Sequence, residues 1–169
     1  MTSRASALPR RWEPARRLPL KWGNYNDRYF AGLVLIIAGA MHLQGANNYT
    51  LIILLIGTVS TAVGWSIMPA RGWRRMIVIL PTITQIWLML TGPMSMWTLT
   101  IPFLCWLIVR HRPLIAYLAL ALPIANGVIL PQFYQEYTSM PEALAISAVV
   151  IVAAAWLARL IAQSAAKRR

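Results

Sequence analysis

Apolar runs separated by short segments rich in arginine constrain this chain more than any other feature of its sequence. The stretch MPARGWRRM at 68–76 places Arg71, Arg74 and Arg75 within five residues, with long apolar runs on both sides. Hydrophobic residues make up 59% of the chain and charged residues 12%, whereas about 25% charged residues is usual in a soluble domain. The pattern is typical of an integral membrane protein.

Six apolar runs approach the length of a membrane-spanning helix, which is about 20 residues for a hydrocarbon core of about 30 Å. Several runs are shorter, and helix ends within the interface or local bilayer thinning would cover the difference. The stretch 76–109 is too long for one crossing, and Thr91-Gly92-Pro93 in its middle is typical of a turn. The six runs are 29–43, 50–68, 76–90, 94–109, 114–130 and 141–161.

The basic residues predict how these runs cross the bilayer, because positive residues near span ends stay cytoplasmic. Lysines and arginines fall in four patches, at 1–28, 71–75, 110–112 and 159–169, and the intervening connections contain none. We predict an all-α membrane protein, a six-span helical bundle of three outward-pointing hairpins with both termini cytoplasmic. The topology-setting residues are Arg71, Arg74, Arg75, Arg110 and Arg112.

The chain divides into a membrane domain and two basic ends. We expect residues 1–28 to form a Pro-containing cytoplasmic tail with little order, residues 29–162 the transmembrane domain, and residues 163–169 a short basic tail. An alternative is that the first span is a cleaved signal ending at the small residues AGA, 38–40. Because arginine far outnumbers lysine, a GC-rich bacterial genome and a bacterial plasma membrane are expected.

The net charge of +12 bears on the partners of the chain. Strong basicity often indicates a nucleic-acid partner, but here apolar stretches separate the cations, so we expect no nucleic acid. Each cation near an anionic leaflet adds about 1 kcal/mol of attraction. We therefore expect contact with the bilayer and with anionic lipid headgroups at the cytoplasmic face. Another integral membrane protein, or a second copy of the chain, is a further possible partner.

Polar residues inside membrane spans are candidate functional sites, because burying them in lipid is costly. This chain has three: Gln85 near the middle of the third run, Asn126 in the fifth, and His42 near the end of the first. The competing interpretation is structural, since such side chains also hydrogen-bond between helices. His42 and Glu136 could also pair at the outer surface, although two ligands do not make a metal site.

Small residues and prolines predict how the helices pack. Small residues on one face let helices approach closely, and proline inside a span kinks the helix and frees a carbonyl. We expect kinks at Pro102 and Pro123. The predicted close-packing residues are Gly32 and Gly39 in the first run, Gly57, Thr61 and Gly64 in the second, and Ala145, Ala148 and Ala155 in the sixth.

The sequence contains no catalytic motif of a known type. The single cysteine, Cys105, lies in an apolar run, and we expect no cofactor and no metal. The chain is therefore interpreted as a non-catalytic membrane module, an accessory or assembly subunit or a sensor-type membrane domain that acts through helix contacts. The alternative is a transporter or channel subunit for a neutral or apolar solute.

Overall fold

Helices form all the regular secondary structure in the described part of the chain. The computed structural model describes residues 23–44, 51–70 and 72–167. Most of the predicted tail 1–28, the connection 45–50 and Arg71 lie outside these residues. The predicted six helical segments are confirmed. They are α1 (Tyr25–Gln44), α2 (Leu51–Ile67), α3 (Gly72–Ile77) with α4 (Ile79–Met89), η2 (Pro93–Leu99) with α5 (Thr100–Val109), η3 (Leu114–Leu120) with α6 (Ala121–Phe133), and α7 (Met140–Lys167), which the short turn η4 (Tyr137–Ser139) precedes.

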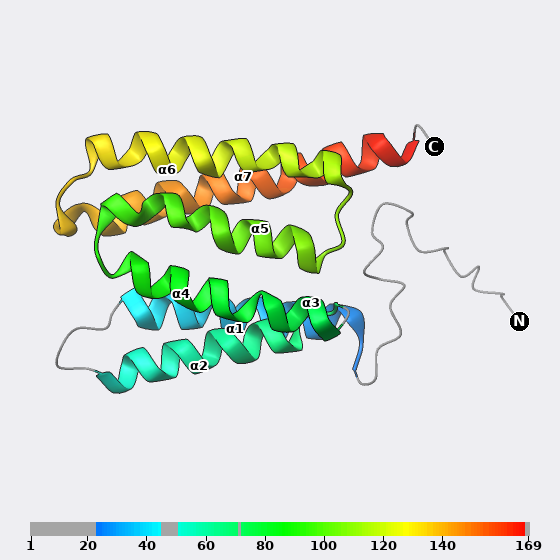
Figure 1. Ribbon diagram of the computed structural model, residues 1–169, viewed down its shortest axis with the longest axis horizontal. Coiled ribbons are helices and arrows are strands. Elements are labelled where there is room, and N and C mark those ends of the chain that lie inside the picture. Colours follow the sequence, from blue (N-terminus) through cyan, green and yellow to red (C-terminus); the bar gives the residue numbers. More distant parts are fainter. Residues whose placement is uncertain (1–22, 45–50, 71, 168–169) are drawn as a thin grey trace, which may run out of the picture.

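The helical segments lie side by side in a layered bundle (Figure 1). α1 packs along α2 on one side and α6 packs along α7 on the other, with α4 and α5 between the two pairs. Consecutive segments run back and forth along the long axis. As a result, the start of α1, the ends of α2 and α5, and the end of α7 all lie at one end of the bundle (Figure 1).

The turn predicted at Thr91-Gly92-Pro93 is present between α4 and η2. Gly92 adopts a φ of 104° and a ψ of −170°, a conformation that residues with a Cβ avoid. Its N–H donates to the Met89 carbonyl oxygen at 3.2 Å, and its carbonyl oxygen accepts from the Ser95 N–H at 3.0 Å. Glycine therefore permits the abrupt reversal that keeps 76–109 from forming one long helix.

Three evenly spaced prolines divide the middle segments into two parts each. Pro81, Pro102 and Pro123 are each the third residue of an α-helix, namely α4, α5 and α6. Proline lacks an N–H and its ring clashes with the carbonyl four residues earlier, so the regular helix is interrupted one turn before it. The preceding turns are α3, η2 and η3. The breaks at Pro102 and Pro123 agree with the sequence analysis, and Pro81 adds a third.

Glycines bring α1 and α2 into backbone contact, as the small-residue pattern predicted. A methyl group added to Gly39 would lie 2.7 Å from the Gly57 carbonyl oxygen and would collide with Thr61. One added to Gly64 would lie 2.8 Å from the Gly32 carbonyl oxygen. The two helices therefore pack at a distance that only glycine allows.

The prediction of a close-packing face of small residues in the last helix is wrong. In α7, Ala145 and Ala148 are exposed and Ala155 is only partly buried. The buried positions of α7 are Met140, Ala143, Ser147, Ala154, Ala158 and Ala162. Alanine occurs on every face of this helix, so composition alone did not identify the packed one. The buried face contacts η3 and α6, and Ala154, Ala158 and Ala162 join a core with Phe103 and Leu107 of α5.

Candidate functional site

Arginines converge at the end of the bundle where α1 begins and α2 ends, which we call the basic end. The Arg28 Nε donates to the Ile67 carbonyl oxygen at 3.1 Å, and an Arg75 Nη donates to the Ser66 carbonyl oxygen at 3.1 Å. Ser66 and Ile67 are the last two residues of α2. The final carbonyls of a helix lack partners and carry partial negative charge, so cations there are stabilising. Burial, together with the nearby positive charge of Arg75, lowers the pKa of the Arg28 guanidinium.

Arg74 makes the same kind of contact with a different helix. Its Nη donates at 3.0 Å to the carbonyl oxygen of Ile108, next to the last residue of α5. The Arg74 guanidinium also lies 5.0 Å from the centre of the Trp73 ring. Adjacent arginines of the short helix α3 thus contact the ends of two helices that are far apart in sequence. Through these hydrogen bonds, α3 connects the end of α2 to the end of α5.

The residues RHRP at 110–113 terminate helix α5. The N–H of Arg112 donates to the Leu107 carbonyl oxygen at 3.1 Å, and the N–H of His111 donates to the Ile108 carbonyl oxygen at 3.1 Å. These two bonds form a Schellman motif, in which the residue at the position of His111 is left-handed and is usually glycine. His111 has a φ of 53°. Pro113 follows the motif and prevents the helix from continuing.

Tyr29 joins α1 to α5 through its ring and its hydroxyl. The Arg110 guanidinium lies 4.5 Å from the centre of the Tyr29 ring, and the Trp106 Nε1 donates to the Tyr29 hydroxyl at 3.3 Å. Arg110 and Arg112 also lie 5.5 and 5.6 Å from the centre of the Trp106 ring. Arginine over an aromatic face is attracted by the negative π-surface. Both arginines are largely buried, with 8% and 7% of their surfaces exposed.

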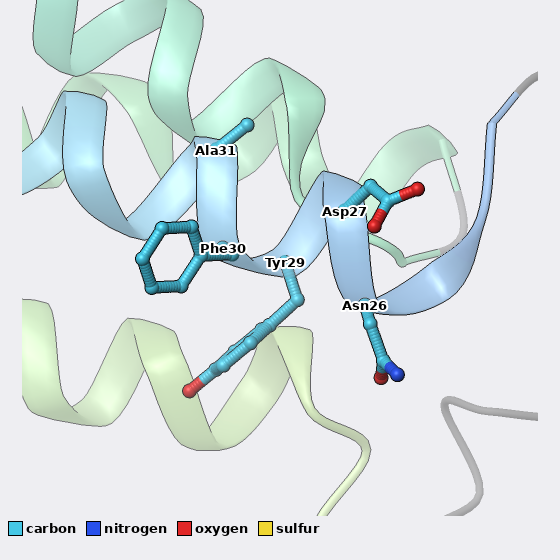
Figure 2. Close-up of a pocket in the computed structure, with 5 residues that line it drawn as sticks. All are labelled: Asn26, Asp27, Tyr29, Phe30 and Ala31. Atoms are coloured by element: carbon cyan, nitrogen blue, oxygen red, sulfur yellow. The ribbon is translucent and has the colours of Figure 1, made fainter.

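An open hollow lies beside these aromatic and basic residues. It has a volume of about 590 Å³ and is lined by Asn26, Asp27, Tyr29, Phe30 and Ala31. Figure 2 shows the Tyr29 ring reaching from α1 toward α5, while the Asp27 carboxylate points to the other side of α1. The hollow therefore has an apolar part at Phe30 and Ala31 and a polar part at the beginning of the helix.

The structure brings together four of the five basic residues that were expected to set the topology. Arg74, Arg75, Arg110 and Arg112 meet at the basic end, and Arg71 lies outside the described residues. Sequence reasoning assigned Arg28 to the tail and so missed it. Its position, one residue before the apolar run at 29–43, was the available signal, because it places Arg28 level with the other cations.

Asn126 takes part in a polar connection between three segments. Its Nδ2 donates to the Ser147 hydroxyl of α7 at 2.9 Å, and this hydroxyl donates to the Met96 sulfur of η2 at 3.8 Å. Next to Asn126, a methyl group added to Gly127 would collide with the Trp97 Cα and would lie 2.8 Å from the Trp97 nitrogen. Asn126 therefore hydrogen-bonds across helices at a place where α6 and η2 are in backbone contact. This contact is the structural role that polar residues inside a span can have.

Gln85 and His42 lie in contrasting environments. Gln85 is 3% exposed in α4. His42 is exposed in the last turn of α1, and its Nδ1 donates to the Ala38 carbonyl oxygen at 2.7 Å. The Glu136 carboxylate accepts from Thr138 at 3.3 Å. Within the described ranges, no three His, Cys, Asp or Glu side chains are grouped to hold a metal.

Comparison with known proteins gave no relative of this chain. No family model matches it. No curated protein and no solved structure matches it either.

Proposed function

We propose that this chain is a small multi-pass integral membrane protein that acts as a non-catalytic module through helix contacts. Its place would be the bacterial plasma membrane, as an accessory or assembly subunit or a sensor-type membrane domain. The basic end would face the cytoplasm together with both termini. The connections at 45–50, 90–92 and 134–139 would face outward and complete three hairpins.

The observation that carries this proposal is the apolar outer surface of the bundle. Two helical segments, Leu114–Phe133 and Met140–Lys167, are long and apolar enough to span a membrane, yet only 33% and 17% of their most apolar windows are buried within the chain. Large exposed apolar patches on a water-soluble chain promote association and aggregation. Lipid tails are the solvent in which such a surface is stable.

The distribution of charge supports the proposed orientation. Arg28, Arg74, Arg75, Arg110 and Arg112 gather at one end of the bundle, and the opposite turns at 90–92 and 134–139 contain no cation. Cations near span ends stay on the cytoplasmic side, where anionic headgroups attract them. Short connections between the helices leave little surface outside the membrane, which favours action through helix contacts.

Alkaline carbonate extraction of membranes tests whether the chain is integral. We expect the full-length chain to remain in the pellet after extraction and to dissolve only with detergent, because its outer surface is apolar. Release into the carbonate supernatant would contradict the proposal. Purification in a mild detergent then tests the module: we expect a stoichiometric complex, with an integral membrane partner or with a second copy.

A transporter or channel subunit for a neutral or apolar solute is the second candidate, and Gln85 is the observation that favours it. Gln85 is buried within an apolar helical segment, and a polar side chain inside a membrane span is a candidate contact for a passing solute. Liposomes containing the purified chain separate the two functions. Glycerol flux that exceeds empty liposomes and is lost in Gln85→Leu would favour transport, whereas flux equal to that of empty liposomes favours the module.

A further inference from the structure

The outward face of α3 and of the first turn of α4 is apolar, although it lies at the basic end of the bundle. We propose that this surface, which we call the α3 face, is an interfacial anchor that binds the boundary between headgroups and acyl chains in the cytoplasmic leaflet. The inference rests on the proposed function, because it requires the basic end to lie at the cytoplasmic surface of a membrane. The members of the α3 face are Trp73, Met76, Ile77 and Leu80.

Helical spacing and exposure define the α3 face. Its members are spaced at i, i+3, i+4 and i+7, which places them on one side of a helix. Val78, at the break between α3 and α4, keeps a φ of −84° and a ψ of −15°, so the direction of the face continues across the break. Val78 and Thr82, on the opposite side, are both 1% exposed. The exposed fractions of the face are 57% for Trp73, 63% for Met76, 52% for Ile77 and 72% for Leu80.

The charged residues of α3 turn toward the bundle. Arg74 donates to the Ile108 carbonyl oxygen of α5, and Arg75 donates to the Ser66 carbonyl oxygen of α2. A surface helix of a water-soluble protein has the reverse arrangement, with its apolar residues toward the core and its charges toward the solvent. The arrangement in α3 therefore suits an environment around the bundle that is apolar beside the helix.

The position of the α3 face identifies lipid as its occupant. The face begins beside the arginines of the basic end and continues into the exposed residues Thr84 and Trp87 of α4, on the flank proposed to meet lipid tails. An indole ring, with an apolar body and a polar N–H, is favoured at the boundary between tails and headgroups. The Arg74 guanidinium lies 5.0 Å from the centre of the Trp73 ring, so a cation accompanies the ring at this level. Trp73 is therefore the residue that we expect to fix the depth of the basic end.

Spin labels on single cysteines of the full-length chain in liposomes test the anchor, because oxygen concentrates in the bilayer and a nickel chelate stays in the water. Cys105 is first replaced by alanine. We expect labels at Met76→Cys, Ile77→Cys and Leu80→Cys to collide with oxygen more often than with the chelate. The label at Leu80→Cys should lie about 6 Å deeper than that at Met76→Cys, from a rise of 1.5 Å per residue. Thr138→Cys, exposed in the turn before α7, is the control and should collide mainly with the chelate.

A second substitution tests the role of Trp73. Trp73→Ala should move the Met76→Cys label toward the water, because the aromatic anchor is lost. Trp156→Ala removes an indole that is 63% exposed on α7 and should leave that label in place. An unchanged label depth in Trp73→Ala, or an equal change in Trp156→Ala, would overturn the inference.

The two collision rates also identify any other occupant of the α3 face. Frequent collision of the Met76→Cys and Ile77→Cys labels with the chelate would place the face in water. Rare collision with both reagents would show that a second copy or a partner protein covers it. Either result in a chain that resists carbonate extraction refutes this inference and leaves the proposed function intact. Release of the chain by carbonate would instead refute the proposed function.

Discussion

Single arginines in this protein stabilise the ends of helices as well as placing charge on one side of the bundle. Arg28 and Arg75 donate to the last carbonyls of α2, and Arg74 donates to a carbonyl at the end of α5. A lysine could supply the charge but not the rigid, planar set of donors with which arginine contacts a carbonyl and an aromatic ring together. The preference for arginine in the basic patches therefore has a structural reason at these positions.

Among the residues that the structure describes, His111 is the one non-glycine residue with a positive φ. With a φ of 53°, a residue bearing a Cβ is strained by about 1–2 kcal/mol, and glycine removes that strain at some entropic cost. We therefore expect His111→Gly to raise the free energy of unfolding by about 0.5–1 kcal/mol. SDS titration of the purified chain measures this. His111→Val is the opposing variant and should lower stability, and a more stable His111→Val would contradict the left-handed assignment.

Whole elements are positioned by glycine where helices touch and by proline where they break. α1 and α2 approach through Gly32, Gly39 and Gly64, and α6 approaches η2 through Gly127. Pro81, Pro102 and Pro123 each follow a break that divides a segment after its first six or seven residues. The bundle therefore combines close helix contacts at small residues with buried clusters of larger side chains such as Trp65 and Met96.

The α1–α2 contact predicts a clear effect of one methyl group. Gly64→Ala would place a Cβ 2.8 Å from the Gly32 carbonyl oxygen and 2.9 Å from the Ile36 nitrogen, so the helices must separate. We expect a loss of about 1–3 kcal/mol in the free energy of unfolding, the usual cost of overpacking. Val63→Ala, at an exposed position of the same helix, is the control and should change stability little. Equal stability of Gly64→Ala and the original chain would refute the close packing.

Replacing Pro81 should change the protection of nearby backbone amides from hydrogen exchange. Pro81→Ala restores an N–H that can bond to the Ile77 carbonyl and removes the ring that clashes with it. We expect α3 and α4 to join into one helix and the amide protons of residues 78–82 to exchange more slowly with solvent deuterium. Hydrogen exchange followed by mass spectrometry measures this change. Unchanged exchange would show that the break at Val78 has a cause other than the proline.

The sequence predicted the elements better than their contacts. Apolar length and turn residues located all six helical segments, because helices shield their own backbone whatever their neighbours are. The faces that touch were predicted only where glycine is rare and distinctive, as at Gly39 and Gly64. In α7 the abundant alanines gave no such distinction. The roles of Arg28 and Tyr29 depend on contacts with α2 and α5 that no local pattern contains.

In the whole molecule, apolar surface and positive charge are distributed differently: the apolar surface surrounds the long axis of the bundle, and the positive charge lies at one end of it. Many large apolar side chains are exposed on the outside of the bundle, while arginines collect at the basic end. The proposed bilayer location would account for both, with lipid tails around the sides of the bundle and headgroups and cytoplasm at the basic end. The proposed orientation and the three hairpins both depend on this single arrangement.

Cysteine accessibility in intact cells tests that arrangement most directly. The buried Cys105 is replaced by alanine, and single cysteines are placed at two exposed positions, Gly72 at the basic end and Thr138 in the turn before α7. A membrane-impermeant maleimide should label Thr138→Cys in intact cells and Gly72→Cys only after permeabilisation. Labelling of Gly72→Cys from outside, with Thr138→Cys protected, would contradict the account.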